Sequence, residues 1–340
     1  MTNSHVSTPV DRSSERPPEH AAISSRASRL PRPAVRQLVP YAALVALLAF
    51  FTTQSANFLT VTNILVMAQS ASILMVIALG ATLVVVAGSV DLSVGAVATI
   101  VGVLAAHLSQ QGHTSSIWLL VLVGALCGLV NGILVAYVRL PSFLVTLGTM
   151  FIFGGIAAKI TGGYFVSLNY PSLSEAVNGK PIGQIPAGLL WMVVAIAVSA
   201  FLAYRTVFGR RVYAIGGNEK VAKLAGQPVE RTKVWMFVFS GLLAGFGGLM
   251  LVARAGGSSP DMGEPFLLTA IAAIVMGGTS LNGGVGGPAR TIVGVVIIEV
   301  LTNGLIIIGA DPYYQNIALG SVIICAVIVT IKRSEMAAIK

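Results

Sequence analysis

A polar break that contains a carboxylate separates two long apolar runs of this chain. Residues 88–95 read Gly-Ser-Val-Asp-Leu-Ser-Val-Gly, which places Asp91 and Ser93 where a membrane helix would otherwise continue. Irregular backbone near that depth is tolerated where protein buries it or water lines it, so we expect the break to face a pathway or to close a gate. Asp91 would also serve as the N-cap of the next helix, with Ser93 incidental. We favour the cap, and the two roles are compatible.

Glu299 is the one acid well inside an apolar run, and Asn303 lies one helical turn away from it. An ionisable group in such a position usually faces a polar partner or water. Glu299 is therefore either a structural contact or a proton or substrate site. The second option keeps a proton-coupled secondary transporter as a rival function.

Residue patterns for covalent chemistry are not found. The chain has no HExxH and no GxSxG, and its four histidines, at positions 5, 20, 107 and 113, include no pair at metal-ligand spacing. The glycine run at 283–287 lacks the Lys-Ser or Lys-Thr ending of a phosphate loop, so this chain should not bind ATP itself. Cys127 and Cys325 fall in apolar segments and are interpreted as core residues. We predict no catalytic, cofactor or metal site, and a membrane enzyme has little support.

The composition is that of a membrane protein. Of the 340 residues, 55% are hydrophobic and only 10% are charged, too few polar side chains to cover a water-soluble fold of this size. The net charge of +9 resides mostly in the N-terminal tail and in short loops between apolar runs. This distribution argues against a nucleic acid partner and for the lipid bilayer as the main solvent.

About ten segments are apolar enough for transmembrane helices, which need about 20 mostly apolar residues each. We place them at 38–55, 61–87, 93–110, 117–138, 142–160, 186–205, 233–253, 265–280, 289–309 and 316–331, and the second is long enough to be broken. Residues 1–37 are polar and rich in Ser, Pro and Arg, and no cleavage site follows them, so we predict a disordered basic tail before an uncleaved first span. The fold class is an all-α polytopic membrane protein.

Basic residues are distributed asymmetrically about these spans. With the Arg-rich tail in the cytoplasm, 18 of the 21 Lys and Arg residues fall on the cytoplasmic side, leaving Lys159, Lys180 and Arg254 at or near the outer side. Both termini, the loop 206–232 and the tail 333–340 are then cytoplasmic. The loop 161–185 is periplasmic, where it is either a compact cap that docks a partner or a simple connector.

Glycines at four-residue spacing mark helix faces suited to close contact, because small residues let two backbones approach in a membrane. They are Gly124, Gly128 and Gly132, with Gly241 and Gly245 repeating the pattern. We expect this contact within the subunit rather than at a dimer seam.

A second glycine-rich break, at 277–288, contains Asn282 and precedes a segment, 291–296, that echoes 99–104. The echo indicates an internal repeat with pseudo-symmetric halves. In this topology, however, the two echoing helices run parallel, whereas inverted halves would place them antiparallel.

The cytoplasmic loop 206–232 carries the signals of a short helix. Asn218 can cap a helix that continues to Leu224. Glu219 lies near the positive N-terminus of that helix, and Gly226 and Pro228 end it. A basic, moderately apolar helix on the membrane surface is suited to docking in a groove of a soluble partner. The alternative is a solvated loop.

At this loop the chain resembles the permeases of ATP-binding-cassette importers of the ribose, xylose, arabinose and galactose class, within the branched-chain amino acid permease superfamily. The similar stretches cover most of residues 60–333 in order. They are GATLVVVAGSVDLSVGAV (80–97), LVNGILVAYVRLPSFLVTLGTM (129–150), GRRVYAIGGNEKVAKLAGQPV (209–229) and the segment 277–288.

The resemblance implies that residues 218–226 form the coupling helix that seats in a separate ATPase subunit. The positions assigned to this coupling loop are Gly209, Arg210, Arg211, Tyr213, Gly216, Gly217, Asn218, Glu219, Ala222 and Gly226. The candidate translocation path or gate consists of Asp91, Ser93, Asn131, Thr146, Thr149, Asn282, Glu299 and Asn303. Two positions depart from the usual motif, since its alanine pair reads Val-Ala at 221–222 and Gln227 stands where an apolar residue is expected.

The function implied is that of a permease subunit in the bacterial inner membrane, with residues 38–332 as the transmembrane permease domain. It would translocate a monosaccharide of the ribose, pentose or hexose class by alternating access. The implied partners are an ATPase subunit, a periplasmic substrate-binding protein and a second permease copy or paralogue. A branched-chain amino acid permease shares this plan, so only substrate binding separates the two.

Overall fold

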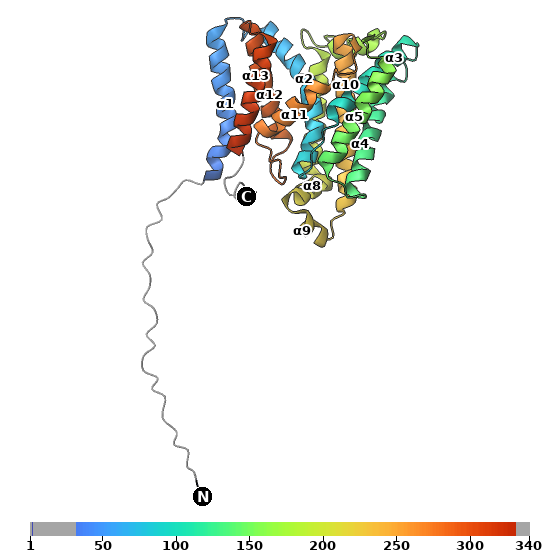
Figure 1. The fold of residues 1–340 in the computed structure, drawn as a ribbon. Helices are drawn as coiled ribbons and strands as arrows, with labels where there is room; N and C mark the ends of the chain where they lie inside the picture. Colours follow the sequence, from blue (N-terminus) through green and yellow to red (C-terminus); the bar gives the residue numbers. More distant parts are fainter. Residues whose placement is uncertain (1, 3–31, 331–340) are drawn as a thin grey trace.

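The computed structural model describes residue 2 and residues 32–330, and this part of the chain is almost entirely helical (Figure 1). The elements are α1 (Arg32–Gln54), α2 (Val61–Val86), α3 (Val94–Gln110), η1 (Ile117–Leu120), α4 (Val121–Ala136), α5 (Ser142–Thr161), β1 (Val166–Ser167), α6 (Pro171–Asn178), α7 (Ala187–Arg205), α8 (Val207–Gly217), α9 (Glu219–Leu224), α10 (Val229–Ala255), β2 (Gly257–Ser258), α11 (Glu264–Met276), α12 (Pro288–Ile307) and α13 (Pro312–Thr330). The C-terminal tail 333–340 and most of the tail 1–37 lie outside the described residues.

Each apolar segment predicted as a span coincides with a helix. Among the described residues, six helical stretches are long and apolar enough to cross a membrane, namely α2, η1 with α4, α5, α7, α10 and α12. Shorter apolar stretches lie in α1, α3 and α11. Several boundaries differ from the prediction by a few residues, since α1 begins at Arg32, α10 begins at Val229, α11 ends at Met276 and α13 begins at Pro312. Helix α2, which was long enough to be broken, is continuous and contains no proline.

Helices α2 and α10 form the centre of the molecule. Helix α2 is apolar around its whole circumference, and every residue from Ala71 to Val86 is buried. Helix α10 lies against α2, α3 and α4, and α12 covers another side of α2. In Figure 1, α2, α3, α4, α5 and α10 stand together, while α1, α12 and α13 form a second group that is joined to them through α11 and through the contact of α12 with α2.

The predicted glycine faces meet inside the subunit, between α4 and α10. A Cβ atom on Gly124 would lie 2.4 Å from the carbonyl oxygen of Gly241, and one on Gly128 would lie 2.1 Å from that of Phe237. The two backbones therefore touch, which only glycine allows at these positions. This confirms the expected contact within the subunit.

The loop 161–185 is compactly folded, as expected for a cap, and the docking of a partner on it stays a prediction. Strand β1 pairs antiparallel with β2, with Val166 opposite Ser258, and α6 buries Leu173 and Val177. The indole Nε1 of Trp191 donates to the carbonyl of Ala176, which fixes α6 on α7. At the other end of the molecule, α8 and α9 extend beyond the helical bundle (Figure 1).

The two echoing segments lie in α3 and α12. Helix α3 packs against α10 and α5, whereas α12 packs against α11 and α2. The two helices therefore have different neighbours, so the echo is not matched by equivalent packing. The internal repeat with pseudo-symmetric halves stays a prediction.

Candidate functional site

The polar break between α2 and α3 forms a turn around Asp91. Helix α3 begins at Val94 with Ser93 as its N-cap residue, whose side chain makes no capping hydrogen bond. Asp91 Oδ1 accepts the backbone N–H of Ser93 at 3.0 Å and the Ser93 hydroxyl at 2.6 Å. The predicted N-cap role of Asp91 and the incidental role of Ser93 are both wrong. The carboxylate closes a turn before the helix begins, because its nearest donors lie two residues further along the chain.

Two further helices donate to this turn. The Ser240 hydroxyl on α10 donates to Asp91 Oδ2 at 2.8 Å, and Asn131 Nδ2 on α4 donates to the Ser93 hydroxyl oxygen at 2.8 Å. All four side chains are buried, and Asn131 Oδ1 has no hydrogen-bond partner among the described residues. A buried carboxylate with donors on both oxygens can remain in the interior, and it ties the turn to α4 and α10.

Helix α5 supports the same turn from another side. Ser142 Oγ accepts the backbone N–H of Val90 at 3.1 Å. Thr146 Oγ1 donates to the Ser142 carbonyl at 2.8 Å, and Thr149 Oγ1 donates to the Thr146 carbonyl at 3.3 Å. Thr146 Oγ1 also donates to the Val90 carbonyl at 3.4 Å, so Ser142 and Thr146 tie α5 to the break, whereas Thr149 hydrogen-bonds within α5.

The remaining candidate path residues lie elsewhere. Asn303 exchanges two amide hydrogen bonds with Asn63 of α2, at 2.9 and 3.0 Å, so its partner is not Glu299. Glu299 is partly buried on α12, where Arg254 acts on it electrostatically. Asn282 lies in the connection between α11 and α12. The structure thus gathers Asp91, Ser93, Asn131, Thr146 and Thr149, and the backbone of Asn282 lies against Gly88 at the start of the same break, whereas Glu299 and Asn303 lie apart on α12.

Helix α8 opens the predicted coupling loop and is fixed to the connection between α11 and α12. Thr206 Oγ1 accepts the backbone N–H of Gly209 at 3.2 Å and caps α8. The Tyr213 hydroxyl donates to the Gly286 carbonyl at 2.9 Å. Burial raises the pKa of Tyr213 above its usual value, and the neighbouring Tyr204 raises it further, so the phenol keeps its proton. Arg211 Nε is buried without a hydrogen-bond partner among the described residues.

Helix α9 is the short helix predicted from the sequence. Its N-cap Asn218 accepts the backbone N–H of Val221 at 3.1 Å, and Gly226 follows it with a φ of 75°. Ala222 is buried against the bundle, whereas Val221 and Leu224 are 59% and 89% exposed. Helix α9 therefore presents an apolar tip away from the bundle.

Three segments meet where α8 ends. The backbone N–H of Gly284 donates to the Val86 carbonyl at 2.8 Å. A Cβ atom on Gly216 would lie 1.9 Å from the Val86 carbonyl oxygen, and one on Gly283 would lie 2.7 Å from the backbone nitrogen of Gly88. The predicted coupling loop thus contacts both the glycine-rich connection and the start of the Asp91 turn.

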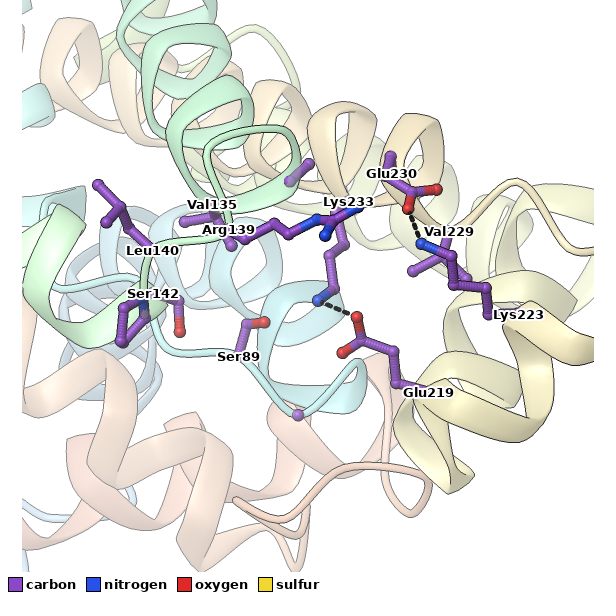
Figure 2. Close-up of a pocket in the computed structure, with 13 residues that line it drawn as sticks. Ser89, Val135, Arg139, Leu140, Ser142, Glu219, Lys223, Val229, Glu230 and Lys233 are labelled. Atoms are coloured by element: carbon purple, nitrogen blue, oxygen red, sulfur yellow. Dashed lines mark hydrogen bonds and ion pairs between the residues drawn. The ribbon is translucent and has the colours of Figure 1, made fainter.

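A pocket of about 490 Å³ opens between α9, the start of α10 and the connection between α4 and α5 (Figure 2). Lys233 Nζ binds Glu219 Oε1 at 2.7 Å, and Lys223 forms an ion pair with Glu230. Arg139 extends from the α4–α5 connection toward the first turns of α10. The pocket is therefore polar and carries both signs of charge.

Several functional candidates escaped the sequence analysis. Ser240 gave no signal, because a serine in an apolar helix becomes a ligand of Asp91 only through contact across 149 positions. Lys233 was counted only as a loop charge. Tyr204 accepts the backbone N–H of Ala289 at 3.3 Å, and the pairing of an interfacial tyrosine with a glycine-rich segment cannot be read from spacing.

No group of three or more His, Cys, Asp or Glu side chains that could hold a metal ion occurs among the described residues. Cys127 is a buried free cysteine, as predicted.

Comparison with known proteins identifies relatives over most of the chain. Residues 63–327 match the family described as branched-chain amino acid transport system / permease component. The ribose import permease protein RbsC of Escherichia coli (strain K12) is 34% identical, covering 86% of this chain and 92% of the relative. RbsC of Bacillus subtilis (strain 168) is 36% identical, with coverages of 88% and 94%. The xylose transport system permease protein XylH of Escherichia coli (strain K12) is 34% identical, with coverages of 85% and 90%. No solved structure matches the chain significantly.

Proposed function

Because this chain belongs to the branched-chain amino acid transport system / permease component family, we propose that it is the permease subunit of a bacterial ATP-binding-cassette importer for a monosaccharide. The similarity to ribose and xylose permeases over 85% or more of the chain carries this proposal. The chain is a transport subunit of the inner membrane rather than an enzyme. Its partners are an ATPase subunit and a substrate-binding protein.

Four finer features belong to the proposal. The chain crosses the membrane about ten times, because each predicted span coincides with a helix. Both termini are cytoplasmic, which agrees with the basic residues around α8 and α9. Two permease chains pair around a shared pathway. The turn around Asp91 contributes to the gate of that pathway, and Glu299 and Asn303 line its outer part.

Helix α9 is proposed as the coupling helix. Its N-terminus is capped by Asn218, and buried Ala222 and the Glu219–Lys233 ion pair hold it against the bundle. The exposed Leu224 provides an apolar anchor for a groove in the ATPase. Because α10 begins directly after α9, a displacement of α9 by the ATPase passes into the centre of the molecule.

The test is sugar uptake into proteoliposomes that contain this chain, its co-purified ATPase and its binding protein, with ATP inside. Labelled ribose, xylose and leucine are compared. We expect uptake of a sugar but not of leucine, and we expect Leu224→Asp to abolish both uptake and ATPase co-purification. Leu59→Asp is the matched control, because Leu59 is an exposed leucine between α1 and α2. Leucine uptake would point to the amino acid permease. Uptake by this chain alone, driven by a proton gradient and lost in Glu299→Gln, would refute the importer.

A further inference from the structure

The pocket beside α9 has one more cation than its acids can neutralise. Its charged lining consists of Arg139, Lys223, Lys233, Glu219 and Glu230. Both acids already have a lysine partner. Arg139 acts on Glu230 only through a longer-range electrostatic interaction and makes no hydrogen bond or ion pair with the described residues. Its guanidinium therefore retains all five donors for another group.

Each lysine of this pocket is paired with an acid, and Lys233 is the less exposed of the two. The Lys233 side chain is only 13% exposed and its ammonium is engaged by Glu219. Breaking the pair between Lys233 and Glu219 would leave the largely buried ammonium without a partner, which costs free energy. Arg139 is exposed on the α4–α5 connection and projects into the same space (Figure 2). It is the group through which an incoming anion would bind.

The backbone at Arg139 supports a role for its side chain. Arg139 has a φ of 63°, and no other non-glycine residue in the described part of the chain has a positive φ. Glycine or asparagine would make this turn at lower conformational cost. A bulky residue held in a left-handed conformation suggests that its side chain is needed where the turn places it.

We propose that the pocket receives an acidic side chain of the ATPase subunit, which forms a bidentate ion pair with Arg139 while the apolar tip of α9 seats in its groove. This inference rests on the proposed function. It adds a second contact, on the α4–α5 connection, to the contact made by α9. A planar carboxylate matches the guanidinium fork, and the net positive charge of the pocket selects an anionic group. The ATPase then engages two segments that both adjoin the Asp91 turn, since Gly88, Ser89 and Ser142 also line the pocket.

The experiment measures the affinity of the ATPase subunit for the full-length permease in lipid nanodiscs at 50 and 300 mM NaCl. We expect Arg139→Gln to weaken binding about tenfold at low salt and to reduce the salt dependence, with Arg139→Lys intermediate. Arg231→Gln is the matched control, because Arg231 is an exposed arginine on α10 outside the pocket, and it should stay within about twofold of the wild type. Thermal unfolding of each variant verifies that it is folded.

The outcomes separate the two proposals. Unchanged affinity in Arg139→Gln, together with lost binding in Leu224→Asp, would overturn the pocket inference and leave the coupling helix intact. Unchanged affinity in Leu224→Asp would overturn the proposed docking itself. Binding of inorganic phosphate to the isolated permease that Arg139→Gln abolishes, with no effect on the ATPase, would assign the pocket to a small anion and refute the inference.

Discussion

Replacing Tyr213 with Phe tests whether α8 transmits motion to the glycine-rich connection between α11 and α12. The substitution removes one oxygen atom and with it the 2.9 Å hydrogen bond to the Gly286 carbonyl. A neutral hydrogen bond of this kind contributes about 1 kcal/mol. That loss changes the equilibrium between the tethered and released connection about fivefold. We therefore expect the sugar transported per ATP hydrolysed to fall about fivefold.

The assay compares uptake with ATP hydrolysis in the same proteoliposomes. Tyr213 is half-buried and lies away from the apolar tip of α9, so binding of the ATPase should not change. The raised pKa of Tyr213 keeps its phenol protonated, so the wild-type ratio should be constant between about pH 6 and 9. Tyr164→Phe is the control, because Tyr164 is 77% exposed beside the outer cap. An unchanged ratio in Tyr213→Phe, or a loss of ATPase binding, would refute the tether.

Three further experiments test the glycine contact, the Asn63–Asn303 pair and the turn at Arg139. Gly128→Ala should lower the midpoint of thermal unfolding by several degrees, since overpacking costs about 1–3 kcal/mol, whereas Gly148→Ala, with nothing within 4 Å, should not. The double-mutant cycle of Asn63→Leu and Asn303→Leu should give a coupling of about 0.6 kcal/mol in thermal unfolding, and zero coupling would contradict the amide pair. Arg139→Gly should raise the unfolding midpoint, because it relieves about 1 kcal/mol of left-handed strain, and should weaken ATPase binding as Arg139→Gln does.

Features that depend on residues close together in the sequence could be predicted from the sequence alone. The helix from Glu219 to Leu224 could be predicted because its cap, its terminating glycine and its proline lie within a few residues of one another. The apolar helices could be predicted because lipid requires every exposed backbone group to be satisfied within a helix. The meeting of the glycine faces followed from their spacing, since only small residues permit that approach.

Long-range partners could not be predicted in the same way. The N-cap role assigned to Asp91 was wrong because a carboxylate before a helix has alternative donors, and here Ser93 and Ser240 supply them. Glu299 and Asn303 were paired by helical spacing, yet Asn303 turns to Asn63 on another helix. Periodicity gives the face on which a polar residue lies but not the residue opposite it.

Helix α10 connects α9, the Asp91 turn and α2. It has 27 residues and is about 40 Å long, long enough to cross the membrane. Its first turns bind α9 through Lys233, its middle binds the Asp91 turn through Ser240, and its last turn binds α2 through Arg254 and Ser70. Because its glycines lie directly on α4, it cannot tilt without moving α4 as well. A displacement of α9 that tilts α10 must therefore strain the hydrogen bonds of Asp91. In the proposed function, this is the route by which a nucleotide-dependent partner on one side of the membrane would bias a gate inside it.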